Sequence, residues 1–260
     1  MGAFHVPVPD RAGRAALVVC VGLLAGLAWL ALVVFEEAAH SVVHLGQGLH
    51  VQTSGGGYVL LFLAGWTLMS VAMMLPTSLP VLATFRALAA DRPDRRALVA
   101  LVVTGYLTAW AGFGVLVYGA HLALTLVRMA TGWAGAGALG AAALLVLAGA
   151  FQFSSLKYRC LDQCRSPLAF VLGYWQGRDE KRRAFDLGFD NGVFCVGCCW
   201  ALMLLMFLVG VHYLGWMLIL GIVMAVEKNA SWGRRLSAPL GAVLIAAGVV
   251  VGVLGYQGTW

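Results

Sequence analysis

Charge is scarce in this sequence. Aspartate, glutamate, lysine and arginine make up only 11% of its 260 residues, whereas hydrophobic residues make up 62%. Soluble domains carry about 25% charged residues, so the composition excludes an ordinary water-soluble enzyme or binding domain. Several apolar runs instead reach the length of roughly 20 residues that a helix needs to cross a bilayer. The composition therefore predicts an all-α, polytopic transmembrane helical bundle.

The sequence also lacks several features that would indicate particular functions. No stretch resembles the phosphate-binding loop of an ATPase, so any transport would be passive or coupled to a partner. No internal repeat or low-complexity segment stands out. The net charge of +6 is distributed over short segments between apolar runs. Membrane topology therefore explains this charge better than binding to nucleic acid does.

The apolar segments are separated by short charged stretches. We predict about seven membrane spans, at residues 14–35, 58–84, 97–126, 136–156, 190–210, 212–227 and 236–256. A cytoplasmic N-terminus then places every basic residue except Arg128 on the inner side, as the positive-inside rule expects. A six-span alternative that merges 190–227 would move three basic residues to the outer side. We therefore predict one integral-membrane domain, 1–260, with an inner loop at about 157–189.

The first apolar run follows two arginines, as a signal peptide would. It is longer than the apolar core of a signal peptide, so we expect it to be retained as a membrane span. Cleavage after Ala39 is the alternative.

The most informative stretch is Phe-Cys-Val-Gly-Cys-Cys-Trp-Ala-Leu-Met at residues 194–203, which holds three of the six cysteines. If this stretch is helical, Cys195 and Cys199 lie one turn apart on one face, with Cys198 beside them. Met203 continues that face into the apolar segment. Thiolates and thioethers are soft ligands that suit Cu(I). The pattern therefore predicts a row of metal-binding sulfurs along a helix.

A second cysteine pair, Cys160 and Cys164, has the same spacing, and Pro167 should end its helix just after them. The predicted topology puts both cysteine groups on the cytoplasmic side, where thiols stay reduced. Lysine and arginine residues around the pair would favour thiolates. We therefore predict that the two groups converge on one site, which as a closed four-cysteine site would suit Zn(II). Plain packing of buried thiols is the alternative.

Glu227, at the inner end of the sixth predicted span, needs a charged partner because a lone carboxylate is costly at such a depth. Lys157 or Arg165 is the expected partner.

A possible metal-capture site lies in the first outer loop. Glu36, His40 and His44 would share one face of a helix, which is the spacing of metal ligands. The alternative is a polar helix end at the boundary between lipid and water.

The second predicted span contains Met69 and Met73, one helical turn apart. These thioethers are candidate ligands for a soft metal, although methionine is also an ordinary filler of irregular cores. Pro76 and Pro80 follow and should kink the helix, because each removes a backbone donor.

Several of these residues together resemble a known pattern. The matching residues are 66–80, Gly105-Tyr106-Leu107 with Trp110, Gln152, Leu156-Lys157, Cys160, Cys164-Arg165-Ser166-Pro167, Cys195–Met203, Trp216 and Glu227-Lys228. Over about residues 60–255, the chain resembles a bacterial family described as predicted metal-binding integral membrane proteins. The resemblance implies metal binding in a bacterial inner membrane. The chain departs from the pattern at Gln163 and Asn191, where the family tends to have histidine, and this departure favours an all-sulfur site.

We therefore predict a membrane protein that binds or moves a soft metal, copper ahead of zinc. The outer Glu/His cluster would capture the ion and the inner cysteines would deliver it. Besides the lipid bilayer, a metallochaperone or a larger membrane complex would be the partner, and no catalytic residue is identified. Two alternatives remain. One is a thiol-redox protein that uses Cys198–Cys199 or Cys160–Cys164, and the other is a structural or assembly subunit of a membrane complex.

Overall fold

The computed structural model describes residues 11–45, 55–131, 136–174, 179–209 and 214–256, and within these ranges every regular element is helical. This confirms the predicted all-α fold. In chain order the elements are α1 (Arg11–Leu45), α2 (Gly55–Met73), η1 (Pro76–Ser78), α3 (Leu79–Leu88), α4 (Arg95–Thr131), α5 (Ala136–Phe151), α6 (Ser155–Arg165), α7 (Pro167–Tyr174), α8 (Glu180–Leu204), α9 (Met206–Val209), α10 (Leu214–Asn229), η2 (Gly233–Leu236) and α11 (Ser237–Tyr256).

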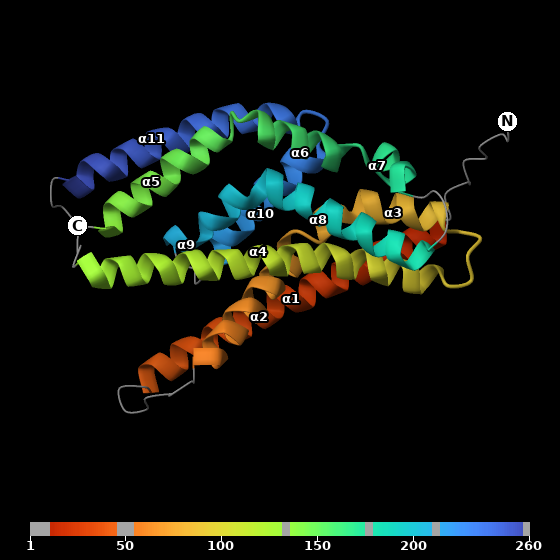
Figure 1. Ribbon diagram of the computed structural model, residues 1–260, viewed down its shortest axis with the longest axis horizontal. Coiled ribbons are helices and arrows are strands. Elements are labelled where there is room, and N and C mark those ends of the chain that lie inside the picture. The colour runs from red at the N-terminus through yellow and green to blue at the C-terminus, as the bar shows by residue number, and fades with distance from the viewer. Residues whose placement is uncertain (1–10, 46–54, 132–135, 175–178, 210–213, 257–260) are drawn as a thin grey trace. The chain divides into compact units, whose positions relative to one another are not determined.

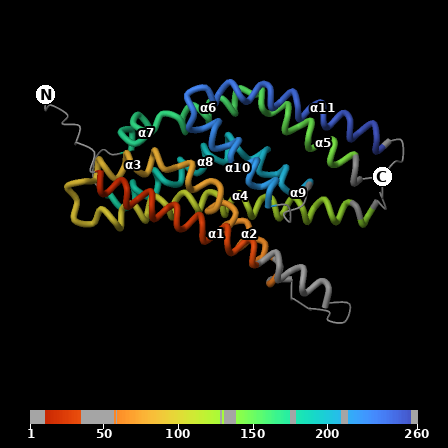
Figure 2. The backbone as a smooth tube through the Cα atoms, turned by 180° about the vertical axis from the view of Figure 1, so that it is seen from behind, coloured from red at the N-terminus to blue at the C-terminus, as the bar shows by residue number. Residues whose placement is uncertain are grey.

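The chain divides into two compact units. The first unit comprises Met1–Gly112 and Gln163–Phe194, and the second comprises Phe113–Asp162 and Cys195–Trp260. Helices α4, α6 and α8 therefore contribute residues to both units. Within the first unit α1 lies beside α2, and within the second α5 lies beside α11, as both views show (Figure 1 and Figure 2).

Four helices are long and apolar enough to cross a membrane. They cover Arg11–Val34, Arg95–Val127, Glu180–Leu208 and Gly233–Gly255. Two bent helix pairs, formed by α2 with η1–α3 and by α5 with α6, would raise the number to six if each pair is one span. Helix α10 has only 16 residues, fewer than the roughly 20 that a span needs. The seven-span count and the cytoplasmic N-terminus therefore remain predictions.

Prolines break the second helix as predicted. Helix α2 ends before Pro76, and the chain bends by 46° between α2 and the segment that contains Pro76 and Pro80. At the bend, the buried Met74 carbonyl accepts hydrogen bonds from Thr77 Oγ1 at 2.7 Å and from Tyr106 OH at 3.0 Å. The Ser78 backbone N–H, which would bond to Met74 in a continuous helix, bonds to the Leu75 carbonyl instead. The two side-chain donors therefore satisfy the Met74 carbonyl, and the break is stable in a buried position.

The predicted inner loop is mostly helical instead. Pro167 separates α6 from α7 as expected, but α8 begins at Glu180, ten residues before the predicted start at 190. This charged stretch was predicted as a loop, but it forms the first part of an amphipathic helix. Lys181 and Arg182 are exposed, whereas Ala184 and Leu187 on the other face are completely buried.

Glycines bring α4 and α8 together within the first unit. A Cβ atom added to Gly188 would lie 2.0 Å from the Val102 carbonyl oxygen, and one added to Gly105 would lie 2.2 Å from the Phe185 carbonyl oxygen. Such close backbone contact is typical of helix pairs that pack through small residues in membranes. Gly105 and Gly188 therefore permit the close packing of α4 and α8, whereas Gly112 has no neighbour within 4 Å of its added Cβ.

Tyr174, the last residue of α7, donates a hydrogen bond to the carboxylate of Asp190 in α8. Burial, this hydrogen bond and the negative charges of Asp190 and Asp186 raise the pKa of Tyr174 to about 12. Each of these effects favours the neutral phenol in the folded protein.

We expect Tyr174 to ionise about two pH units above an ordinary tyrosine. Because its pKa is raised by folding, its contribution to stability is complete below about pH 10 and is lost as the pH rises toward 12. The ultraviolet absorbance of tyrosinate is titrated from pH 9 to 13 in the wild type and in Tyr174→Phe. The difference between the two titrations gives the pH at which Tyr174 ionises. A difference spectrum that develops near pH 10 would contradict the structure.

Candidate metal centre

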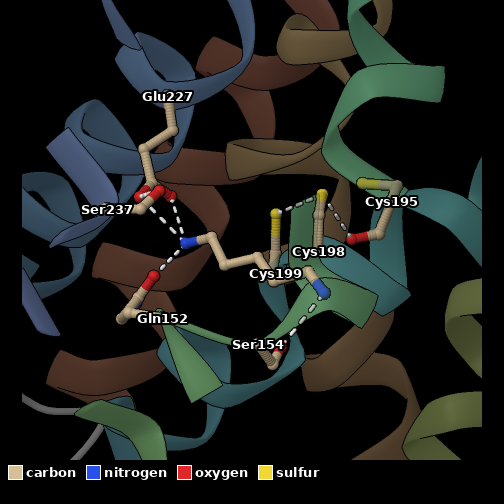
Figure 3. A network of polar contacts seen from close by, with 8 residues as sticks. Gln152, Ser154, Cys195, Cys198, Cys199, Glu227 and Ser237 are labelled. Carbon is tan, nitrogen blue, oxygen red and sulfur yellow. Dashed lines mark hydrogen bonds and ion pairs between the residues drawn. The ribbon is translucent and has the colours of Figure 1, made fainter. Parts of the chain in front are cut away.

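The predicted row of sulfurs is present on α8. Cys195, Cys198 and Cys199 are all buried, and all six cysteines of the chain are free thiols. The Sγ atoms of Cys198 and Cys199 lie 3.3 Å apart, and the Cys198 thiol donates to the Cys195 carbonyl at 3.2 Å (Figure 3). The side chains of Cys195 and Cys199, one turn apart, are also hydrogen-bonded. Three thiols therefore form one connected group within a single turn.

The row extends along the helix to Met203. This side chain is completely buried one turn beyond Cys199. Helix α8 ends at Leu204, and the next methionine, Met206, begins the short helix α9.

Cys160 of α6 approaches the same turn of α8. A side chain at position 197 would place its Cβ 2.6 Å from the Cys160 sulfur, so only glycine fits there without a shift of the neighbouring atoms. Both residues belong to the second unit. Cys164, one turn further along α6, belongs to the first unit and is half-buried.

No three histidine, cysteine, aspartate or glutamate side chains stand ready as a metal site in the part of the chain that the structure describes. Binding through three or more of these cysteines would therefore require their side chains to rotate. The role of Cys160, Cys164, Cys195, Cys198 and Cys199 as metal ligands remains a prediction.

Lys228, near the end of α10, brings a positive charge to the sulfur row. Its Nζ atom lies 2.6 Å from Cys195 Sγ, and the residue is buried. A cation at this distance stabilises the negative charge that a cysteine sulfur carries when it binds a metal. From the sequence we expected this charge to come from the basic residues around Cys160. The feature of the sequence that could have indicated Lys228 is its position as a lysine at the end of an apolar helix.

Next to this contact lies a buried ion pair. Lys157 Nζ lies 2.9 Å from both carboxylate oxygens of Glu227, which confirms Lys157 as the partner of Glu227. Ser237 Oγ donates to Glu227 at 2.7 Å, and Gln152 Oε1 accepts from Lys157. The side chains of Gln152, Ser237 and Glu227 converge in Figure 3. The two charges are paired and further hydrogen-bonded, which is the condition under which an ion pair tolerates burial.

Local geometry positions this ion pair. The chain bends by 61° between α5 and α6, and Gln152 lies in the bend. Ser154 caps α6 by accepting a hydrogen bond from the Lys157 backbone N–H at 3.1 Å. On the other side, Gly233 fits directly against the end of α10, since its added Cβ would lie 2.8 Å from the Glu227 carbonyl oxygen.

The remaining predicted ligands lie elsewhere in the chain. Met69 and Met73 are buried in α2, within the first unit. Glu36, His40 and His44 all belong to α1, which confirms the helical spacing, but their side chains lie outside the described residues. Their role in metal capture therefore remains a prediction.

Comparison with known proteins identifies a family. A family model described as "PpoB2: Copper chaperone" matches residues 63–251 of this chain. No curated protein and no solved structure matches it. The predicted relation to a metal-binding family is thus supported as a relation to a copper-related family, whereas the description of that family as integral membrane proteins is not tested by the match.

Proposed function

Because this chain belongs to the PpoB2 family of copper chaperones, we propose that it is an integral membrane protein that binds Cu(I) on the cysteines of α8 and passes it to a partner protein. The observation that carries the proposal is the group of three buried thiols within one turn of α8. Soft sulfur ligands select Cu(I) over harder ions.

The surroundings of these thiols support binding that is reversible. Cys198 and Cys199 need to lose their thiol protons to bind the metal. The Cys198 thiol lies 3.2 Å from the Cys195 carbonyl oxygen and 3.3 Å from Cys199 Sγ, and both are weak contacts of a neutral thiol. Cys160, which lies against Gly197, offers a further sulfur near the same turn. A chaperone has to release its cargo by exchanging one ligand at a time, and a neighbouring thiol outside the primary group suits such exchange.

The apolar surface supports placement in a membrane. Large apolar side chains are exposed along α1 and α11, among them Leu23, Leu27, Val243 and Val250. A soluble protein rarely exposes long apolar helical faces, whereas lipid covers them at no cost. We place the protein in the bacterial inner membrane, with Glu36, His40 and His44 as the capture site and with transfer that needs no ATP.

Copper binding by the purified chain tests the proposal. Under anaerobic conditions in detergent, we expect the wild type to retain Cu(I) against a chromophoric chelator. Cys198→Ser and Cys199→Ser should each lose most of the bound copper, because a hydroxyl is a poor ligand for a soft ion.

Cys20→Ser is the matched control, since Cys20 is exposed on α1 and belongs to the first unit. Its copper content should equal that of the wild type. A wild type that releases all its copper to the chelator, or serine variants that retain it, would rule the proposal out.

A second function, a thiol-redox couple, is favoured by the Cys198–Cys199 contact of 3.3 Å. Oxidation would join the two sulfurs and pass two electrons and two protons to an external acceptor such as a quinone. Counting the free thiols after mild oxidation distinguishes the two functions. A loss of two thiols that Cys198→Ser abolishes would support the redox function.

A further inference from the structure

One sulfur near the α8 thiols belongs to a different helix. Cys160 of α6 lies against Gly197, and a Cβ atom added to that glycine would lie 2.6 Å from the Cys160 sulfur and 3.3 Å from its Cβ. In the sequence of α8, Gly197 lies between Cys195 and Cys198. The absence of a side chain at position 197 therefore leaves the space in which the Cys160 sulfur approaches this turn of α8.

Two ion pairs hold α6 on either side of Cys160. Lys157 contacts Glu227 of α10 at 2.9 Å, and Asp162 contacts Arg234 of η2 at 3.0 Å. All of these residues belong to the second unit, as do the cysteines of α8. Because the helix is held at both points, the Cys160 sulfur can change its position by rotation of its own side chain while α6 stays in place.

Cys160 is also more exposed than the thiols of α8. It is 8% exposed, whereas Cys195, Cys198 and Cys199 are 1%, 1% and 2% exposed. Its neighbour on α6, Arg159, is exposed. An ion bound to the α8 thiols is therefore shielded from an acceptor, and its departure without a ligand through such buried surroundings would be strongly unfavourable.

We propose that Cys160 is the transfer ligand through which Cu(I) leaves the α8 thiols, and that Gly197 is the positioning residue that gives the Cys160 sulfur access to them. This inference rests on the proposed function, because it concerns the same bound ion. As the bond from Cu(I) to the Cys160 sulfur forms, the bond to one α8 sulfur breaks. The proton that leaves the Cys160 thiol goes to the released α8 thiolate, so copper stays as Cu(I) and no electron is transferred. The acceptor then takes the ion from Cys160 with soft sulfur ligands of its own.

The test separates the rate of Cu(I) transfer from the affinity for Cu(I). Both are measured anaerobically on the full chain in detergent, the affinity by competition with a chelator of known affinity and the rate by rapid mixing with a synthetic peptide that carries two cysteines. Cys160→Ser should transfer Cu(I) about 10-fold more slowly than the wild type, an effect typical of residues just outside the ligands of a metal. Its affinity for Cu(I) should equal that of the wild type, whereas Cys198→Ser should lose affinity.

Gly197→Ala tests the positioning role. Its Cβ should push the Cys160 sulfur aside and slow transfer as much as Cys160→Ser does. The displaced atom is the end of a side chain, so we expect the variant to fold. The double variant Gly197→Ala/Cys160→Ser should be no slower than Cys160→Ser, because both changes remove the same contact. Gly119→Ala is the matched control, since Gly119 is a helical glycine of the second unit with nothing within 4 Å of its added Cβ. Its transfer rate should equal that of the wild type.

The outcomes separate this inference from the proposed function. A wild type that binds no Cu(I) overturns the proposed function. A wild type that binds Cu(I), together with a Cys160→Ser variant that transfers it at the same rate, overturns only the transfer role. The transfer role is also wrong if Cys160→Ser loses as much affinity as Cys198→Ser, because Cys160 would then be a primary ligand.

The role of Gly197 has its own criteria. It is overturned if Gly197→Ala transfers Cu(I) as fast as the wild type, or if the double variant is slower than Cys160→Ser. If Gly197→Ala does not fold, Gly197→Ala/Cys160→Ala should fold, because it removes the sulfur that the new Cβ would meet. Failure of this double variant to fold would likewise overturn the role of Gly197.

Discussion

Substitution of Lys157 by methionine should lower the free energy of unfolding by about 3–5 kcal/mol, the usual cost of breaking a buried ion pair from one side. Lys157 is completely buried, and Glu227 is 1% exposed. Without the ammonium group, the buried Glu227 carboxylate would lose the cation that neutralises it, while the hydrogen bond from Ser237 would remain. Thermal and chemical denaturation in detergent, followed by circular dichroism, measures the loss.

The double variant Lys157→Met/Glu227→Gln is the control for this prediction. It removes both charges together, so it should recover much of the stability that the single variant loses. The glutamine can still accept the hydrogen bond from Ser237. A single variant as stable as the double variant would mean that the ion pair is not formed in the folded protein.

Substitution of Gly188 by valine should have the second large effect. The added Cβ would lie 2.0 Å from the Val102 carbonyl oxygen and 2.7 Å from its carbonyl carbon. Both are backbone atoms, so relief of the clash requires α4 and α8 to move apart within the first unit. We expect a loss of about 3 kcal/mol, at the upper end of the cost of overpacking.

Gly112→Ala is the matched control on α4, because nothing lies within 4 Å of the added Cβ. Alanine also favours the helix over glycine, so this variant should be as stable as the wild type or slightly more stable. Equal unfolding temperatures for Gly188→Val and Gly112→Ala would exclude the close contact between α4 and α8.

Much of the local structure could be predicted from the sequence, because it depends on neighbouring residues. The apolar runs, the break at Pro76 and Pro80, and the helical row of Cys195, Cys199 and Met203 all follow from composition and spacing. The start of α8 was missed because a charged stretch looks the same in a loop and on the exposed face of an amphipathic helix.

The partners of the buried charges were only partly predictable. Sequence reasoning limited the partner of Glu227 to two residues, since a buried carboxylate requires a cation, and the structure selects Lys157. Nothing in the sequence indicated a contact between Lys228 and Cys195, because these residues are 33 positions apart. Such a contact depends on how α10 packs against α8.

The sequence by itself determined that this protein is helical, that it is apolar enough for a membrane, and that it concentrates sulfur in one turn of one helix. These properties depend on residue type and on spacing of a few positions. The tertiary structure alone decided that Cys160 lies over Gly197, that Lys157 neutralises Glu227, and that Lys228 contacts the sulfur row. Each of these contacts joins different helices, and no periodicity within one helix specifies which faces meet.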